Sequence, residues 1–133
     1  MCTQAREAHT YAGRAMSMYE LEVEDKTAAG RVVASLSGEL DLTNAPELEE
    51  RLAAAAPADT LLVLDLNRVV FIDSAALHVL FKLAHDRGRE RLSLVVEPTA
   101  PTVRTLDIVG MKGAARIVNS LADLSGDRES TAG

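Results

Sequence analysis

Apolar and polar residues follow a pattern along the chain that changes period several times. Residues 61–66 form an almost unbroken apolar run of strand length, which is typical of a strand covered on both faces in the middle of a parallel sheet. After a polar break, a second apolar run at residues 69–72 leads to Asp73 and Ser74. A helical pattern begins there and ends at Gly88, a residue type that often stops helices. The pattern therefore places Ser74 within one residue of a helix start, exposed to solvent.

Two further strands and a helix are predicted before this region. Residues 19–24 alternate between apolar side chains and glutamates, as a half-exposed strand does. After a turn at residues 26–30, apolar side chains at alternate positions of residues 32–36 predict a second strand, and so a hairpin. A period of 3.6 residues then predicts a helix that Thr43 or Asn44 can cap. Its expected buried stripe consists of Leu48, Leu52 and Ala55.

The rest of the chain predicts alternating strands and helices. Residues 92–96 read as a fourth strand, and a third helix begins near residues 99–101 and turns Ile108 inward. A short strand at residues 117–118 precedes a last helix at residues 120–123, whose first residues resemble a capping box. With right-handed crossovers, this order gives an α/β fold. We expect a mixed sheet that is parallel except for the N-terminal hairpin and is packed with about four helices.

Length and composition limit the kind of protein. A chain of 133 residues is long enough for one ordinary domain, which we assign to residues 18–125. Residues 1–17 and 126–133 show no sustained period, so we expect a flexible N-terminal extension and a flexible C-terminal tail. Only 3% of the residues are aromatic and the net charge is -6, which argues against nucleic-acid binding.

Several classes of site are not expected. No apolar run has the length of a membrane span and no signal-type segment opens the chain, so we expect a cytoplasmic protein without membrane contact. The single cysteine, Cys2, gives neither a disulfide nor a Cys/His spacing for a metal. Neither GxxxxGK[ST] nor GxGxxG occurs in the chain, so we expect no nucleotide cofactor.

The chemistry of Ser74 has two interpretations. Ser74 or Asp73 can simply cap the helix, or the serine can be a reactive or modifiable hydroxyl. A hydrolase nucleophile elbow needs small residues two positions to either side, where this chain has Ile72 and Ala76. His78 lies one helical turn beyond Ser74, but on a polar stripe that is typical of a solvated face. We therefore expect no enzymatic activity, and a small serine hydrolase is a remote alternative.

Two segments resemble the STAS domain of bacterial anti-sigma factor antagonists. They are residues 37–52, SGELDLTNAPELEERL, and residues 64–80, LDLNRVVFIDSAALHVL. GELD before the first helix and FIDS before the second occur together at the separation that is usual in this family, and the resemblance spans residues 18–124. It implies the STAS fold and makes Ser74 the phosphoacceptor of a partner kinase that is also the anti-sigma factor.

The resemblance implies a partner-switching function in transcription regulation and stress response. The chain would bind an anti-sigma factor with serine kinase activity and so free a sigma factor, and phosphorylation of Ser74 would end the binding. A serine phosphatase is a further expected partner, and we expect a monomer or a weak homodimer. The expected partner-binding residues are Gly38, Glu39, Leu40, Asp41, Thr43, Asp73, Ser74, Ala75 and His78. A STAS-domain scaffold or lipid-transport accessory protein without phosphorylation is the alternative.

The motif departs from the family pattern at two positions. Ala75 and Ala76 stand where the family commonly has serine or threonine followed by glycine. Ala75 leaves Ser74 as the single hydroxyl of the motif. Ala76 adds a methyl group that favours the helix, and we expect this methyl group to narrow the backbone approach that is open to a kinase loop.

Overall fold

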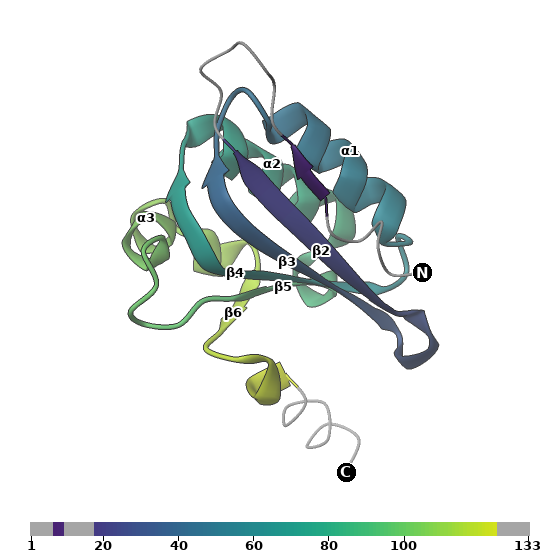
Figure 1. Ribbon diagram of the computed structural model, residues 1–133. Coiled ribbons are helices and arrows are strands. Elements are labelled where there is room, and N and C mark those ends of the chain that lie inside the picture. The colour runs from purple at the N-terminus through teal and green to yellow at the C-terminus, as the bar shows by residue number, and fades with distance from the viewer. Residues whose placement is uncertain (1–6, 10–17, 125–133) are drawn as a thin grey trace.

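The fold is organised around a six-stranded sheet in which the strands lie side by side in chain order (Figure 1). The computed structural model describes residues 7–9 and 18–124. Within these residues the strands are β1 (Glu7–His9), β2 (Tyr19–Lys26), β3 (Arg31–Leu40), β4 (Leu61–Ile72), β5 (Leu92–Val95) and β6 (Arg116–Val118). Strands β1, β2 and β3 pair antiparallel, and the pairs from β3 to β6 are parallel. The predicted mixed sheet with its N-terminal hairpin is thereby confirmed.

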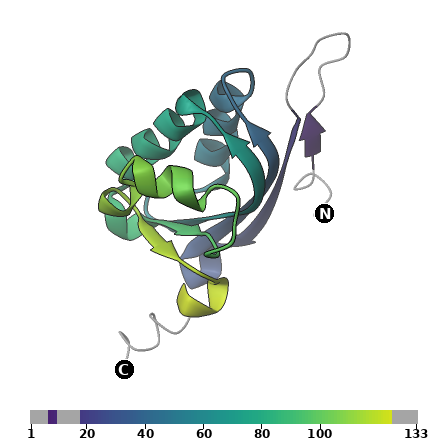
Figure 2. The ribbon, with the colours of Figure 1, turned by 90° about the vertical axis from the view of Figure 1, so that its left-hand side faces the viewer.

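Helices connect the parallel strands and cover the sheet. They are α1 (Ala45–Ala55), α2 (Ser74–Arg87) and α3 (Val103–Ile108), and residues 121–124 are also helical. Short 3-10 turns occur at Thr27–Ala29, Arg89–Arg91 and Met111–Gly113. In the side view, α1 and α2 lie next to each other on one side of the sheet (Figure 2). The four predicted helices are therefore present, and the fold is α/β.

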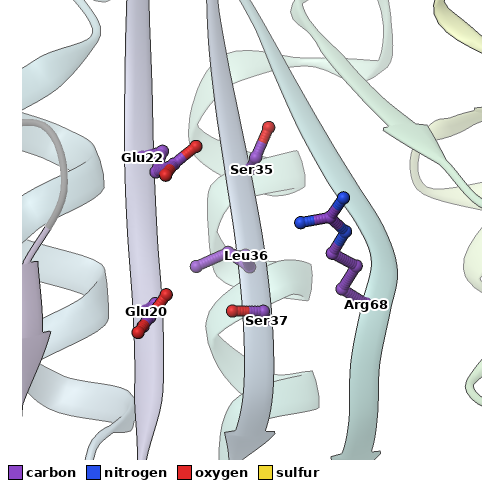
Figure 3. Close-up of a pocket in the computed structure, with 6 residues that line it drawn as sticks. All are labelled: Glu20, Glu22, Ser35, Leu36, Ser37 and Arg68. Atoms are coloured by element: carbon purple, nitrogen blue, oxygen red, sulfur yellow. The ribbon is translucent and has the colours of Figure 1, made fainter.

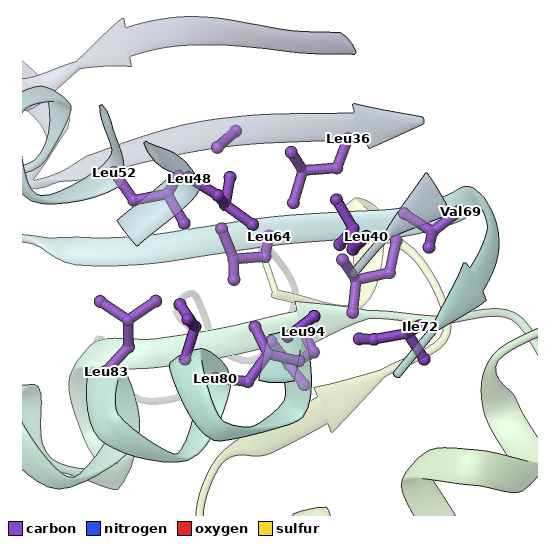
Figure 4. Close-up of a cluster of buried hydrophobic side chains, with 14 of the residues drawn as sticks. Leu36, Leu40, Leu48, Leu52, Leu64, Val69, Ile72, Leu80, Leu83 and Leu94 are labelled. Carbon is purple, nitrogen blue, oxygen red and sulfur yellow. The ribbon is translucent and has the colours of Figure 1, made fainter. Parts of the chain in front are cut away.

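The main core lies between the sheet and the helices and is aliphatic. Figure 4 shows part of it, with apolar side chains from β3, β4 and β5 packed against those of α1 and α2. The labelled members are Leu36, Leu40, Leu48, Leu52, Leu64, Val69, Ile72, Leu80, Leu83 and Leu94. A second, smaller cluster contains Val33, Val63, Val95 and Leu124. In β3 and β4 its members alternate with main-core residues, so it lies on the opposite face of the sheet.

Strand β4 continues through the polar break seen in the sequence. Its register with β3 shifts between Ser35 and Ser37 and again between Gly38 and Glu39, and at each shift β4 contains one residue more than β3. Such an extra residue is a β-bulge, which bends a strand and changes the direction of its side chains. The polar break at Asn67 and Arg68 therefore coincides with the first bulge, and β4 continues through it as a single strand.

Strand β1 was not predicted. Its residues pair antiparallel with β2 inside the stretch 1–17, for which the sequence showed no sustained period. A strand of three residues is too short to show a period of two. The other residues of that stretch and the tail at residues 126–133 lie outside the described residues. Their expected flexibility therefore stays a prediction.

Two side chains expected in the core lie elsewhere. Ile108, the last residue of α3, is 76% exposed, because this helix is only six residues long and buries Leu106 alone. Ala55 is half-buried, whereas the C-cap residue Ala56 is fully buried. The buried face of α1 consists of Ala45, Leu48 and Leu52.

Candidate functional site

Asp73 joins three parts of the chain at the end of the sheet where α2 begins. Its Oδ1 accepts a hydrogen bond from the Ala76 amide at 3.1 Å, which makes Asp73 the N-cap of α2. Its Oδ2 accepts from the Leu42 amide at 3.1 Å, and its own amide donates to the Leu40 carbonyl at 3.1 Å. One residue therefore ties the start of α2 to the end of β3 and to the loop before α1.

Ser74 is the first residue of α2 and is exposed. This confirms its predicted position and identifies Asp73 as the helix cap. His78 is also exposed, one helical turn beyond Ser74, and Ala75 is half-buried. Ala76 is 1% exposed and belongs to the main core. The expectation that its methyl group narrows the approach to Ser74 is therefore wrong, because that methyl group lies inside the protein.

The loop between β3 and α1 is closed by its own side chains. Asp41 Oδ1 accepts hydrogen bonds from both the amide and the hydroxyl of Thr43. Asn44 Oδ1 accepts from the Asp41 amide at 3.0 Å, and Asn44 Nδ2 donates to the Glu39 carbonyl at 2.9 Å. The Asn44 side chain is almost completely buried and is used inside the loop, so it forms no cap bond to α1. These bonds fix the loop conformation beside Ser74.

Gly38 and Leu40, two predicted partner-binding residues, shape the site from within. Gly38 has a φ of +93°, and a Cβ atom there would lie 2.4 Å from the Met18 carbonyl oxygen. The neighbouring Glu39 amide donates to that same oxygen at 3.0 Å. Leu40 is completely buried in the main core, so its side chain is not available to a partner.

The predicted residues fall into two further groups by exposure. Glu39, Thr43, Ser74 and His78 are exposed. Asp41, Asp73 and Ala75 are half-buried. The structure thus gathers all the predicted residues at one end of the sheet, with the side chains of Glu39, Thr43, Ser74 and His78 facing solvent.

Exposed apolar side chains at this end of the sheet, among them Leu42 and Phe71, were not predicted from the sequence. Leu42 is 72% exposed and Phe71 is 50% exposed. The usable signal for Leu42 was a leucine between Asp41 and Thr43 in a loop of polar residues. Phe71 gave no such signal, because it sits in an apolar run that reads as a buried strand end.

Tyr19 connects β2 to α1 close to the site. Its hydroxyl donates to Glu47 Oε1 at 3.0 Å and accepts from Arg51 Nη1 at 3.3 Å. Burial raises the pKa of Tyr19 to about 12; the hydrogen bond from Arg51 lowers it, and the hydrogen bond to Glu47 raises it again. The neutral phenol is therefore the form that the fold requires.

Two basic residues of α2 hold this helix against α1 and the loop after it. Lys82 Nζ lies 2.7 Å from Glu49 Oε2. The Arg87 guanidinium donates to the carbonyls of Ala56, Pro57 and Thr60, and burial lowers the pKa of Arg87. These contacts fix the direction of α2 and so the position of its first residue.

A small polar hollow lies on the face of the sheet that points away from α1 and α2 (Figure 3). It has a volume of about 40 Å³ and is lined by Glu20, Glu22, Ser35, Leu36, Ser37 and Arg68. Such a volume holds a few water molecules at most. In the described residues, including this hollow, no group of three or more His, Cys, Asp or Glu side chains is placed to hold a metal ion. Nor does any helix of residues 18–124 have the length and apolar character to cross a membrane.

Comparison with known proteins identifies the family. Residues 20–124 match the family model of the STAS domain. The anti-sigma-F factor antagonist RsfB of Mycobacterium tuberculosis is 34% identical over 95 residues, which cover 71% of this chain and 78% of RsfB.

Solved structures agree with this match. An anti-sigma factor antagonist from Mycobacterium paratuberculosis superimposes with a TM-score of 0.70 at 31% identity, covering 83% of this chain and 94% of that one. The unphosphorylated form of SpoIIAA shares the fold, with a TM-score of 0.61 at 18% identity over 82% of this chain and 96% of SpoIIAA. The chain therefore belongs to the STAS-domain family of anti-sigma factor antagonists.

Proposed function

We propose that this chain binds an anti-sigma factor with serine kinase activity and so frees a sigma factor, and that phosphorylation of Ser74 ends the binding. The observation that carries the proposal is the position of Ser74. It is exposed at the start of α2, and the preceding residue, Asp73, is hydrogen-bonded to the loop before α1. A modification of Ser74 therefore takes place within the surface that the predicted partner-binding residues form.

Electrostatics explains why a phosphoryl group would weaken docking. It adds a charge of about -1.5 to -2 at neutral pH. Asp73 and Asp41 already place carboxylates at this end of the sheet. A partner that packs against the surface would have to desolvate the added charge next to these carboxylates, which costs free energy.

The same position lets the domain remain folded after phosphorylation. The N-terminus of a helix carries partial positive charge and favours an anion, and Ser74 is the first residue of α2. SpoIIAA, a protein of the same fold, has been solved in both an unphosphorylated and a phosphorylated form. We therefore expect phosphorylation of Ser74 to change the docking surface and to leave the fold intact.

A pull-down from native lysate with the full chain as bait identifies the partner. Mass spectrometry of the captured proteins should show a kinase-like anti-sigma factor, and a serine phosphatase is a further expected partner. Mass spectrometry of the bait should show phosphate on Ser74. Recovery of transporter subunits in place of an anti-sigma factor would support the lipid-transport alternative and contradict the proposal.

Two substitutions of Ser74 test the switch. Ser74→Ala adds neither charge nor bulk, so it should bind the captured anti-sigma factor as tightly as the unmodified chain. Ser74→Asp places a second carboxylate beside Asp73 and should bind at least about tenfold more weakly, since unpaired buried charges are costly. Isothermal titration calorimetry gives both dissociation constants, and circular dichroism melts check that each variant is folded. Equal affinities of the two variants would show that Ser74 has no switching role.

A further inference from the structure

Four large exposed apolar side chains occur at the end of the sheet where α2 begins. They are Met18, Leu42, Val70 and Phe71, and each is at least 50% exposed. We call them the apolar rim. Single exposed apolar residues are common on proteins, but a group of them in one place marks an interaction surface. We propose that the apolar rim is the part of the docking surface where the anti-sigma factor buries its own apolar side chains.

The sheet register brings the strand residues of the apolar rim together. Tyr19 of β2 pairs with Gly38 of β3, so Met18 lies beside Glu39, whose amide donates to the Met18 carbonyl at 3.0 Å. Glu39 in turn pairs with Phe71 of β4. Met18, which directly precedes β2, therefore forms one row with Glu39 of β3 and Phe71 of β4.

The second β-bulge exposes two consecutive residues of β4. The register with β3 passes from Val69 to Phe71 while β3 advances by one residue, so Val70 is the extra residue. In a regular strand, two neighbouring side chains point to opposite faces and one of them would be buried here. In this bulge both Val70 and Phe71 are exposed. Bulges of this kind are common next to functional sites.

Leu42 is held in place by Asp73. The Leu42 amide donates to Asp73 Oδ2, and Asp73 follows Phe71 by two residues in the chain. The Asp41–Thr43 hydrogen bonds fix the loop on either side. A side chain presented by a fixed backbone loses little entropy on binding, so Leu42 is well suited to anchor a partner.

Charge and position indicate what covers the apolar rim. Glu39 lies between Met18 and Phe71 of the rim. The carboxylates of Asp41 and Asp73 lie beside Leu42. A complementary surface has an apolar centre with lysine or arginine around it. One member of the rim also lies next to Ser74, because Asp73 joins the Leu42 amide to the start of α2. The occupant is therefore the anti-sigma factor, and this inference rests on the function proposed above.

Alanine substitutions test the rim against a matched control. Leu42→Ala and Phe71→Ala should each weaken binding of the captured anti-sigma factor at least about tenfold, as truncation of interface anchors does. Ile108→Ala is the control, because Ile108 is 76% exposed but lies at the end of α3, outside the rim. This variant should bind like the unmodified chain. Calorimetric titration gives the affinities, and thermal melts of all three variants should match the unmodified chain.

The outcomes separate this inference from the proposed function. If Ser74→Asp weakens binding but Leu42→Ala and Phe71→Ala bind normally, the switch stands and the rim is not part of the interface. If Ile108→Ala weakens binding as much as the rim variants, the apolar contact is not localised at the rim. If the unmodified chain captures no anti-sigma factor, the proposed function itself is wrong.

Discussion

Gly38 lets the backbones of β2 and β3 approach more closely than any residue with a side chain would. It has a φ of +93°, and an added Cβ would lie 2.4 Å from the Met18 carbonyl oxygen. Gly30 has a similar φ of +85° but nothing within 4 Å of such a Cβ. The two glycines therefore separate the cost of a left-handed backbone from the cost of a clash.

Alanine at each glycine measures these two costs. Gly30→Ala should lower the free energy of unfolding by about 1 kcal/mol, which is the cost of a left-handed residue with a side chain. Gly38→Ala should lower it by about 3 kcal/mol, because the clash with the Met18 carbonyl adds to the same backbone strain. Urea denaturation of the two variants gives both values. If both variants lose the same free energy of unfolding, then β2 and β3 move apart at residue 38 without a free-energy cost.

For single residues, the sequence predicted where a residue lies in its helix or strand better than it predicted which residues it contacts. The change from an apolar run to a helical period located Ser74 correctly. The bond between Leu42 and Asp73 could not be predicted, because it joins residues 31 positions apart and leaves no local pattern. Leu40 was expected at the docking surface, yet Leu42 is the exposed leucine. The chain leaves the sheet after Leu40, and the turn that follows directs the next apolar side chain outward.

Among the secondary-structure elements, β2 and α1 are joined through a titratable side chain. Tyr19 is buried, and its hydroxyl contacts Glu47 and Arg51 of α1. Its pKa is raised from 10.0 to about 12. The folded state therefore keeps the phenol proton at pH values where the unfolded chain loses it.

The pH dependence of stability follows from this difference. Below pH 10 the Tyr19 contribution is fully present, and it is lost as the pH rises toward 12. The free energy of unfolding should therefore fall by about 1 to 2 kcal/mol more in the unmodified chain than in Tyr19→Phe across this range. Urea denaturation at several pH values measures both proteins, and groups common to them cancel in the comparison. Parallel pH curves would show that Tyr19 titrates normally.

The order of elements was predictable from period and turn residues, whereas irregular strands were not. The two-residue polar break in β4 looked like a strand end, because a bulge places polar residues where a regular strand has apolar ones. Its continuation depends on pairing with β3, which is a tertiary contact. Strand β1 also depends on its partner, since three residues have little strand preference of their own.

The whole domain buries apolar residues on both faces of the sheet, and its C-terminal helix belongs to the second face. Leu124 is completely buried with Val33, Val63 and Val95. We propose that residues 18–125 form the folding unit and that the segments on either side contribute little to stability. The boundary at residue 125 matters because it lies directly after Leu124.

Two truncated chains test this boundary. The chain of residues 18–125 should melt within a few degrees of the full chain, because the only described element that it loses is β1, an edge strand of three residues. The chain of residues 18–119 lacks Leu124 and should melt at least about 10 °C lower, because deleting a buried leucine costs about 2 to 5 kcal/mol. Calorimetric melts give both midpoints. A large loss for the longer chain would show that a terminal segment is part of the core.

The order of strands in the sheet has a consequence for synthesis on the ribosome. Because spatial order equals chain order in the described sheet, each strand after the first leaves the exit tunnel with one of its neighbours already made. The β2–β3 hairpin can form first, and β4, β5 and β6 can then add one at a time to a growing edge. No strand has to wait for a partner beyond the next strand in the chain, so each unpaired edge, which promotes aggregation, is exposed only until that next strand is made.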